Sequence, residues 1–384
     1  AGPMPPVGAR FRYASQRARG PPQGPGRTRT PPSLLLAFAA LALPGATTQE
    51  ACESVWARTR ARCGVVAFRH VPKTAGTAVR FLVKDMAADC GWVCPGRYMG
   101  LSVTHEVFSQ AEPPVSGFGE LFLAPIPATN HTGRFPKFVA ESHNEWHGYE
   151  LLLRDLARLK MGWPRCAVRV FAVVREPLAF VVSRWSYMRY YRKFPRFVAD
   201  YMGRCMASPA ERLKHREACA LQLEYIWPEA SKLQIRGLGP DGVRAHVAAS
   251  LPRGEGGEVG AEVVTVLPFE DLELGLLLFA HRAGLPLGGL EGVTARVNGP
   301  GDKRVSREVV KLAKTRAYRE LGQPGARARV EEFLALDRWL HDRVTADLRA
   351  ALAAVERLAA ERDGGRAPGP AAGETRARGG GEGG

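Results

Sequence analysis

Several features that would quickly assign a class are missing from this chain of 384 residues. No internal repeat is visible, which argues against a solenoid or a repeat array. The seven cysteines include no C-x-x-C pair, so a structural zinc site is not expected. The apolar run at residues 34–43 has ten residues and would span about 15 Å as a helix, half the core of a bilayer.

Acidic residues are absent from residues 1–49, which contain six arginines and many prolines and glycines. A basic stretch, a short apolar run and the small residues that follow it are typical of a secretory signal or a weak signal anchor. An organellar transit peptide is the alternative, because the segment is rich in arginine and free of acid. In residues 361–384, glycine, proline, alanine and charge replace apolar periodicity and predict a disordered tail.

The net charge of the chain is +16, and the first 49 residues carry six of these charges, while residues 361–384 are balanced. The remaining +10 therefore falls on the central part of the chain. A basic globular domain favours an anionic partner such as nucleic acid, an acidic membrane, a nucleotide, or a sulfated or carboxylated glycan. A merely solvated basic surface is the alternative.

The segments "AVRVFAVVR" and "EVVTVLPF" are rich in β-branched residues without polar alternation, as in strands buried on both faces. Strands alternating with helices predict an α/β fold, a P-loop-like parallel sheet with helices on both faces, in one domain at residues 60–360. The predicted strands are 65–69, 136–141, 168–174 and 262–267. The predicted helices are 75–88, 148–160, 177–192, 196–206, 210–226, 241–249, 270–283, 306–320 and 326–360.

The first candidate site follows the first strand, in "AFRHVPKTAGTAVRF" at residues 67–81. Pro72 delays the helix, and Lys73 adds a positive charge where the helix dipole favours an anion. Free amide N–H groups are expected at Thr74, Ala75, Gly76, Thr77 and Ala78. The Walker order is absent, because the lysine precedes the glycine. A helix capped by Thr74 beside a surface lysine is the structural alternative.

The second candidate site is "VFAVVREPLAFVVSRWSY" at residues 170–187. Arg175 closes a strand, Pro177 opens a helix, and Ser183 lies about two turns later. An arginine and a hydroxyl in this arrangement suit a second phosphate. Alternatively, Arg175 pairs with Glu176 or Glu141 and Ser183 faces solvent. Together the two motifs predict a ligand with two phosphate-like ends.

These two stretches resemble the sulfotransferases that use PAPS, 3′-phosphoadenosine-5′-phosphosulfate, in particular the Golgi enzymes that sulfate heparan-type glycans at the 2-O or 6-O position. "HVPKTAGT" is similar to their 5′-phosphosulfate loop and "VVREPLAFVVSRWSY" to their 3′-phosphate segment. "VPKTA" favours the 2-O branch and "ESHNEWHGYELL" the 6-O branch. "FLALDRWLHDRV" resembles a C-terminal helix of both. The likeness covers roughly residues 64–350 and implies the sulfotransferase fold.

The resemblance implies a role for each matching residue. Lys73 would contact the phosphosulfate and stabilise the leaving phosphate, and Arg175 and Ser183 would bind the 3′-phosphate. His143 would be the general base, although Ser142 precedes it where the 2-O branch usually has glycine. The residues implied to bind the 5′-phosphate are Thr74, Gly76, Thr77 and Ala78. The basic loop at 294–304 would close on the nucleotide through Arg296 and Lys303, unless it is only a solvated loop.

The implied reaction is sulfuryl transfer from PAPS to a hydroxyl of an anionic polysaccharide, in the Golgi lumen. A histidine with a pKa near 6.5 can take the proton of the hydroxyl, and the reaction needs no metal. Neither a metal nor a nucleic-acid partner is expected. Two alternatives remain: an inactive heparin-binding or nucleic-acid-binding protein on the same fold, and a magnesium-dependent P-loop phosphotransferase.

Entry into the secretory pathway would also make two disulfides plausible. The candidate pairs are Cys90 with Cys94 and Cys205 with Cys219. Buried free thiols are the alternative. Because the number of cysteines is odd, at least one thiol stays unpaired within the chain.

Overall fold

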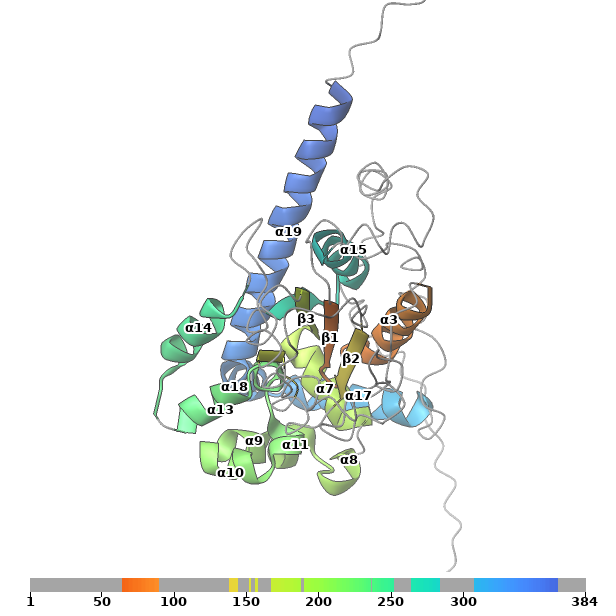
Figure 1. Ribbon diagram of the computed structural model, residues 1–384. Coiled ribbons are helices and arrows are strands. Elements are labelled where there is room, and N and C mark those ends of the chain that lie inside the picture. Colours follow the sequence, from red (N-terminus) through yellow and green to blue (C-terminus); the bar gives the residue numbers. More distant parts are fainter. Residues whose placement is uncertain are drawn as a thin grey trace, which may run out of the picture.

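The computed structural model describes an α/β protein, and Figure 1 shows its arrangement. The described residues are 64–89, 138–143, 152, 156–157, 167–187, 190–235, 237–251, 264–283 and 307–364. The predictions for the leader, for the loop at 294–304, for the Cys90–Cys94 pair and for the tail after residue 364 lie outside these residues.

The centre of the molecule is a sheet of four parallel strands in the order β2-β1-β3-β4. These strands are β1 (Gly64–His70), β2 (Phe138–His143), β3 (Ala167–Val174) and β4 (Val264–Pro268). Every residue of β1 is buried; its apolar run Val65–Phe68 predicts this, whereas Arg69 and His70 are buried polar residues. The predicted parallel sheet is confirmed, with β2 lying two residues further along the chain than predicted.

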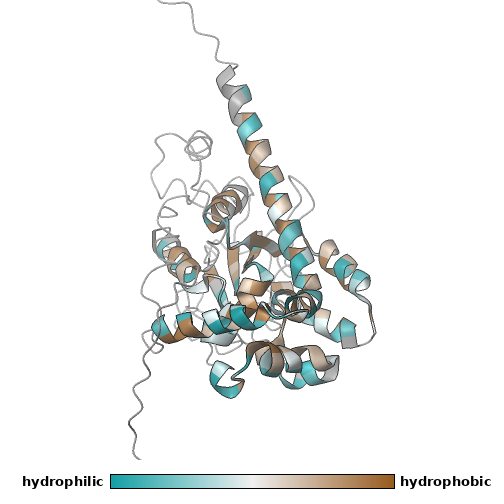
Figure 2. Cartoon of the chain, turned by 180° about the vertical axis from the view of Figure 1, so that it is seen from behind, coloured by the Kyte–Doolittle hydropathy of each residue, from teal (hydrophilic) through white to brown (hydrophobic). Residues whose placement is uncertain are grey.

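Helices cover both faces of this sheet. Alternate residues of β1 enter different apolar clusters, Val65 on one side and Val66 on the other, because side chains alternate across a strand. The cluster of Val65 includes residues of α7 (Pro177–Tyr187), and the cluster of Val66 includes residues of α3 (Gly76–Asp89) and α15 (Leu272–Ala283). Figure 2 shows hydrophobic segments of the strands, in brown, between the helices.

The long helix α19 (Ala335–Gly364) contributes to both apolar clusters. Its first three turns supply Leu340 and Val344 to the cluster of α7, and its middle turns supply Leu348 and Leu352 to the cluster of α3. The spacing of four residues places these side chains along one stripe of the helix. Figure 1 shows α19 passing the sheet and projecting beyond α15.

Short helices fill the face of the sheet that carries α7. These are α8 (Tyr190–Lys193), the π-helix η1 (Phe197–Met202), α9 (Gly203–Ala207), α10 (Pro209–Lys214), α11 (Arg216–Cys219), α12 (Gln222–Ile226), α13 (Pro228–Ile235) and α14 (Pro240–Ala249), together with α17 (Arg307–Leu321) and α18 (Ala326–Phe333). The disulfide predicted between Cys205 and Cys219 is confirmed and ties α9 to α11.

Several predicted helices were too long. The helix predicted at 210–226 is three helices, divided at His215, where ψ is 30°, and at Ala220 and Leu221, whose backbones are extended with ψ of 138° and 157°. The carboxylate of Glu224 accepts the Leu221 N–H at 3.0 Å and so fixes the new helix start. The helix predicted at 177–192 ends at Tyr187, the one at 196–206 begins as η1, and the one at 326–360 is divided at Leu334.

The connections of β1 and β3 create a topological switch point. These strands are neighbours, yet β1 leads into α3 on one face of the sheet and β3 leads into α7 on the other. In sheets of this kind, ligands bind beyond the carboxyl ends of the strands at the switch point. Both predicted sites follow these two strands, and so both lie there. Among the described helices, none has the length and apolarity to cross a bilayer.

Candidate functional site

The loop after β1 has an unusual backbone. Lys73 and Ala75 both have φ of 64°, a left-handed value that few non-glycine residues adopt. Each such residue costs about 1–2 kcal/mol of conformational free energy, and such residues cluster at ligand sites. Alternating left-handed and right-handed residues also turn successive N–H groups towards one concave surface, which is a suitable site for an anion.

The hydrogen bonds of this loop differ in part from the prediction. The hydroxyl of Thr74 is buried and donates to the Val71 carbonyl at 2.7 Å, so it does not cap the helix. The Ala75 carbonyl accepts the first helical bonds, from the N–H groups of Ala78 at 2.9 Å and Val79 at 3.2 Å. The expectation of a free amide at Ala78 was therefore wrong, because a tight first turn uses it.

Gly76 and Thr77 head helix α3, where helical geometry provides no acceptor for an N–H group. Thr77 is exposed, whereas Gly76 is buried. A Cβ atom on Gly76 would lie 1.6 Å from Nε2 of His70. The glycine is therefore required by the close approach of the histidine ring, and its N–H remains at the helix start.

His70 belongs to a buried charged cluster beneath this loop. Its Nδ1 lies 2.8 Å from Oε1 of Glu141 in β2, and its ring stacks on Phe68 at 5.5 Å. Arg80 of α3 forms a forked ion pair with the same carboxylate, which includes a bond of 2.6 Å from its terminal nitrogen to Oε1. Glu141 thus joins β1, β2 and α3 under the candidate anion loop.

The loop after β3 is held by a side chain from α12. The backbone N–H of Arg175 donates to the amide oxygen of Gln222 at 2.7 Å, and the amide nitrogen of Gln222 donates to the Arg175 carbonyl at 2.7 Å. The guanidinium of Arg175 lies over the ring of Phe269, 4.8 Å from its centroid. The backbone N–H and carbonyl of Arg175 are therefore both held by hydrogen bonds, while its side chain lies over the ring of Phe269.

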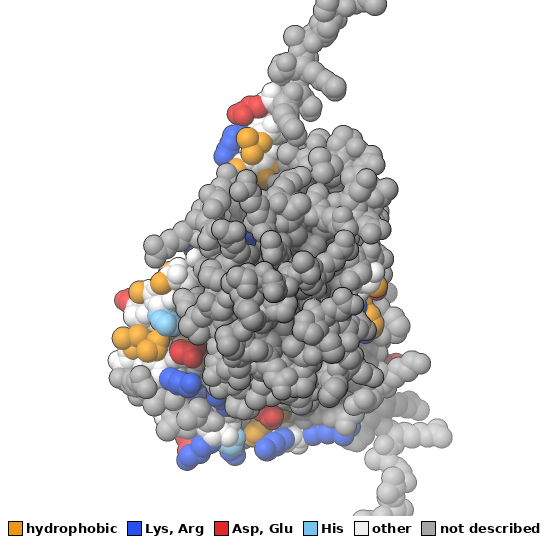
Figure 3. Space-filling view, viewed as in Figure 1, with side chains coloured by type: hydrophobic (Ala, Val, Ile, Leu, Met, Phe, Trp, Pro, Cys, Tyr) orange, Lys and Arg blue, Asp and Glu red, His pale blue; other side chains and the backbone are white. Residues whose placement is uncertain are grey.

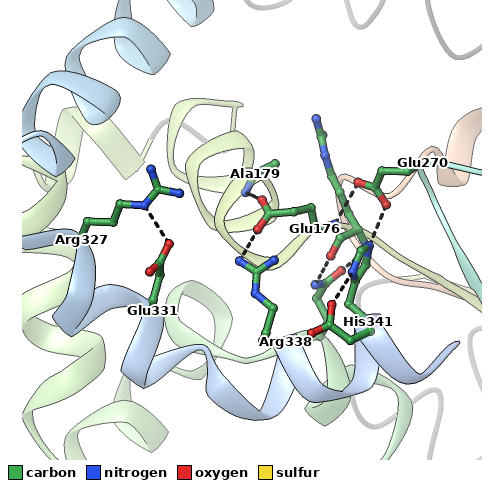
Figure 4. A network of polar contacts seen from close by, with 10 residues as sticks. Glu176, Ala179, Glu270, Arg327, Glu331, Arg338 and His341 are labelled. Atoms are coloured by element: carbon green, nitrogen blue, oxygen red, sulfur yellow. Dashed lines mark hydrogen bonds and ion pairs between the residues drawn. The ribbon is translucent and has the colours of Figure 1, made fainter. Parts of the chain in front are cut away.

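The carboxylates proposed as alternative partners of Arg175 make other ion pairs. Glu176 pairs with Arg338 of α19 at 2.5 Å and accepts the N–H of Ala179 at 2.6 Å (Figure 4). Glu141 pairs with Arg80, as described above. Ser183 is buried within α7, so the alternative in which it faces solvent was wrong.

The two predicted motifs lie against each other. A guanidinium nitrogen of Arg175 donates to the Lys73 carbonyl at 3.4 Å. The Lys73 ammonium lies over the ring of Tyr187, at the end of α7, 3.0 Å from its centroid. The loops that follow β1 and β3 therefore lie together and form one candidate site.

Helix α17 adds a residue that the sequence did not single out. Burial, and after it the positive charge of Arg175, lower the pKa of Lys314. A second cation near Arg175 strengthens the positive potential of this side of the site. Its only signal in the sequence was an amphipathic helix, which does not distinguish a site residue from a surface lysine.

The remaining predicted residues are placed only in part. The backbone of His143 ends β2 in register with His70, at the carboxyl edge of the sheet. The side chain of His143 lies outside the described part, as do Arg296 and Lys303. Among the described residues, no group of three or more His, Cys, Asp or Glu side chains could hold a metal ion.

Comparisons of the chain with protein-family models, with curated proteins and with solved structures find no match.

Proposed function

We propose that this protein is a PAPS-dependent carbohydrate O-sulfotransferase with the sulfotransferase fold. The observation that carries the proposal is the contact between Arg175 and the Lys73 carbonyl at the β1–β3 switch point. It brings together two cationic loops, each followed by a helix N-terminus. A nucleotide with phosphates at both its 3′ and 5′ positions suits such a pair of anion sites.

In this proposal, Gly76 and Thr77 bind the 5′-phosphate through the start of α3, and Lys73 stabilises the charge that develops on it. Arg175 of the other loop and Ser183 of the helix that follows it bind the 3′-phosphate. The acceptor oxygen attacks sulfur while the bond from sulfur to the bridging phosphate oxygen breaks. His143 takes the hydroxyl proton, and the products are a sulfate ester and adenosine 3′,5′-bisphosphate.

Two features support a luminal enzyme with an anionic polysaccharide acceptor. The Cys205–Cys219 disulfide suits an oxidising compartment such as the Golgi lumen. The charged residues that line a groove of about 590 Å³ beside η1 are one acidic residue, Glu320, and four arginines, Arg196, Arg316, Arg319 and Arg329. Figure 3 shows further Lys and Arg side chains along the lower edge of the molecule, where α8–α10 lie. A basic surface of this kind attracts a polyanion.

The proposal is tested by calorimetry with adenosine 3′,5′-bisphosphate and by transfer of labelled sulfate from PAPS to a panel of desulfated glycans. We expect Lys73→Ala and His143→Ala each to abolish transfer, and Arg175→Ala mainly to weaken nucleotide binding. Near-normal turnover of His143→Ala would show that another group is the base.

The same experiments separate the alternatives. Binding without transfer to any glycan would favour an inactive polyanion-binding protein on this fold. Magnesium-dependent transfer of a phosphoryl group would favour a P-loop phosphotransferase. Absence of any affinity for the bisphosphate would contradict the proposal itself.

A further inference from the structure

A buried carboxylate of α19 holds the start of α12. Oδ2 of Asp337 accepts the N–H of Gln222 at 2.8 Å, and Oδ1 accepts the N–H of Leu223 at 3.0 Å. Asp337 is only 1% exposed. One carboxylate therefore binds two amide groups at the helix start, where helical geometry leaves them without acceptors.

The residue held in this way is the one that fixes Arg175. Gln222 is also 1% exposed, and its side-chain amide binds both the N–H and the carbonyl of Arg175 at 2.7 Å. These two bonds replace the ladder contacts that a further β-strand would make with the chain just beyond β3. A displacement of Gln222 would therefore move the backbone from which the Arg175 guanidinium extends.

Neighbouring residues of α19 hold the same region by ion pairs. Arg338 pairs with Glu176, and His341 pairs with Glu270 at 2.9 Å. Glu270 in turn accepts the backbone N–H of Glu176 at 2.9 Å. Figure 4 shows Arg338 and His341 reaching from one helix to these two carboxylates. The first turns of α19 thus contact both sides of the loop that bears Arg175.

Burying a charged carboxylate at a helix start costs desolvation free energy. Burial raises the pKa of Asp337 to about 7, against the opposing hydrogen bonds from the N–H groups of Leu223 and Gln222. The nearby Glu224 adds to this effect. An exposed serine or asparagine caps a helix without this desolvation. Groups that violate such a local rule are expected at functional or strained positions.

We propose that Asp337 and Gln222 are positioning residues that act through Arg175, setting its guanidinium for the anion at the carboxyl end of β3. This inference deepens the proposed function and rests on it for the identity of the anion. The proposal adds a residue of α19 to the site: Asp337 lies 162 positions further along the chain than Arg175. The alternative is that both residues serve the stability of the core alone.

A double-mutant cycle separates these two roles. Gln222→Met keeps the volume of the side chain and removes both bonds to Arg175. We expect it to weaken binding of adenosine 3′,5′-bisphosphate about tenfold, which corresponds to about 1.4 kcal/mol. In an Arg175→Ala background the same change should have no further effect, because the residue through which it acts is gone. Equal weakening in both backgrounds, or no weakening, would overturn the proposal.

A second readout does not depend on the nucleotide. Hydrogen exchange of the Arg175 amide should be faster in Gln222→Met and in Asp337→Asn than in the wild type. Ser231→Ala is the matched control, because it also removes a buried hydrogen bond, from the Ser231 hydroxyl to Pro228, without touching Arg175. Unchanged exchange in Gln222→Met would overturn the proposal even if Asp337→Asn failed to fold.

The two measurements also distinguish this inference from the proposed function. A wild-type protein that binds no bisphosphate would refute the proposed function. Faster exchange at Arg175 in Gln222→Met would then still support the positioning of this arginine for another anion. Normal bisphosphate binding with unchanged exchange would leave the proposed function intact and refute the positioning role.

Discussion

The loops after β1 and β3 form one candidate site but are supported in different ways. The first loop rests on His70, Glu141 and Arg80, which belong to the strands and the helix beside it. The second is held by Gln222 of α12 and by the start of α19, far along the chain. The first loop has a strained backbone, whereas the peptide of Arg175 is fixed by a side-chain amide.

This difference separates two ways of preparing an anion site. Around Lys73, the backbone has the left-handed conformation that is typical of anion-binding loops, and a buried ion pair of the neighbouring strand and helix supports it. Around Arg175, a long side chain supplies the charge, and remote helices set the position of its backbone. Substitutions in the first loop should therefore have large effects on stability and binding. Substitutions among the residues that support the second loop should have smaller effects that vary with position.

The largest effect is expected for Gly76→Ala. The added methyl would lie 1.6 Å from His70 Nε2, and the ring cannot retreat easily because Glu141 and Phe68 hold it. We expect a loss of about 3 kcal/mol in the free energy of unfolding and no detectable bisphosphate binding, measured by denaturation and calorimetry.

Gly203→Ala is the matched control for this change. A Cβ on Gly203 meets its nearest atom, the Val198 carbonyl oxygen, at 3.7 Å. In a helix this substitution should be neutral or stabilising by up to about 1 kcal/mol. If Gly76→Ala behaved in the same way, the close packing of His70 against the first loop would be disproved.

The next effect concerns α7, the helix that follows the second loop. Cys219 lies just before Ala220, whose carbonyl accepts a bond of 2.8 Å from Arg184 of α7. Replacing Cys205 and Cys219 together by alanine should lower the free energy of unfolding by about 3 kcal/mol, as expected for a loop of this length. Thermal denaturation of the variant and of the wild type, each with and without reductant, would check this. An equal midpoint temperature for the variant and the oxidised wild type would count against it.

A smaller effect should reveal the link between the loops. Tyr187 ends the helix of the second loop, but its ring contacts the Lys73 ammonium of the first. Removing the ring by Tyr187→Leu should weaken bisphosphate binding by about 1 kcal/mol, because Lys73 loses a cation–π contact. Tyr187→Phe keeps the ring and should bind almost normally; equal losses in both variants would rule out the ring as the cause.

The smallest effect is a pH dependence in the support of the second loop. Burial would lower the pKa of His341, but the bonds and charges of Glu270 and then Asp342 outweigh it and raise that pKa above 6.5. The stabilisation by protonated His341 is therefore complete below pH 6.5 and is lost as the pH rises through the raised value. Between pH 6 and pH 9 the free energy of unfolding should therefore fall more for the wild type than for His341→Gln, as measured by denaturant unfolding. Parallel pH profiles would refute this role.

The same contrast explains what the sequence could predict. The parallel sheet and both loops were recognisable because each signal is local: a β-branched run, then a proline or glycine, then a helix start. Lys73 and Arg175 both belong to sequence patterns of this kind. The contact between them follows from the strand order, which no local pattern records.

The supporting residues could not be found in this way. Glu141 lies 61 residues from Arg80, and Asp337 lies 115 residues from Gln222, so neither pair forms a motif. Thr74 looked like a helix cap, but its hydroxyl binds Val71 instead. The short helices around Ala220 were predicted as one because buried polar caps, and not apolar periodicity, divide them.

The central claim is that the two loops bind the two phosphates of one nucleotide. The most direct test compares calorimetric titrations of the wild type and Arg175→Ala with adenosine 3′,5′-bisphosphate and with adenosine 5′-monophosphate. We expect Arg175→Ala to weaken bisphosphate binding about a hundredfold, or about 2.7 kcal/mol, and to leave the monophosphate unchanged. An equal loss for both ligands, or equal affinity of the wild type for both, would contradict the claim.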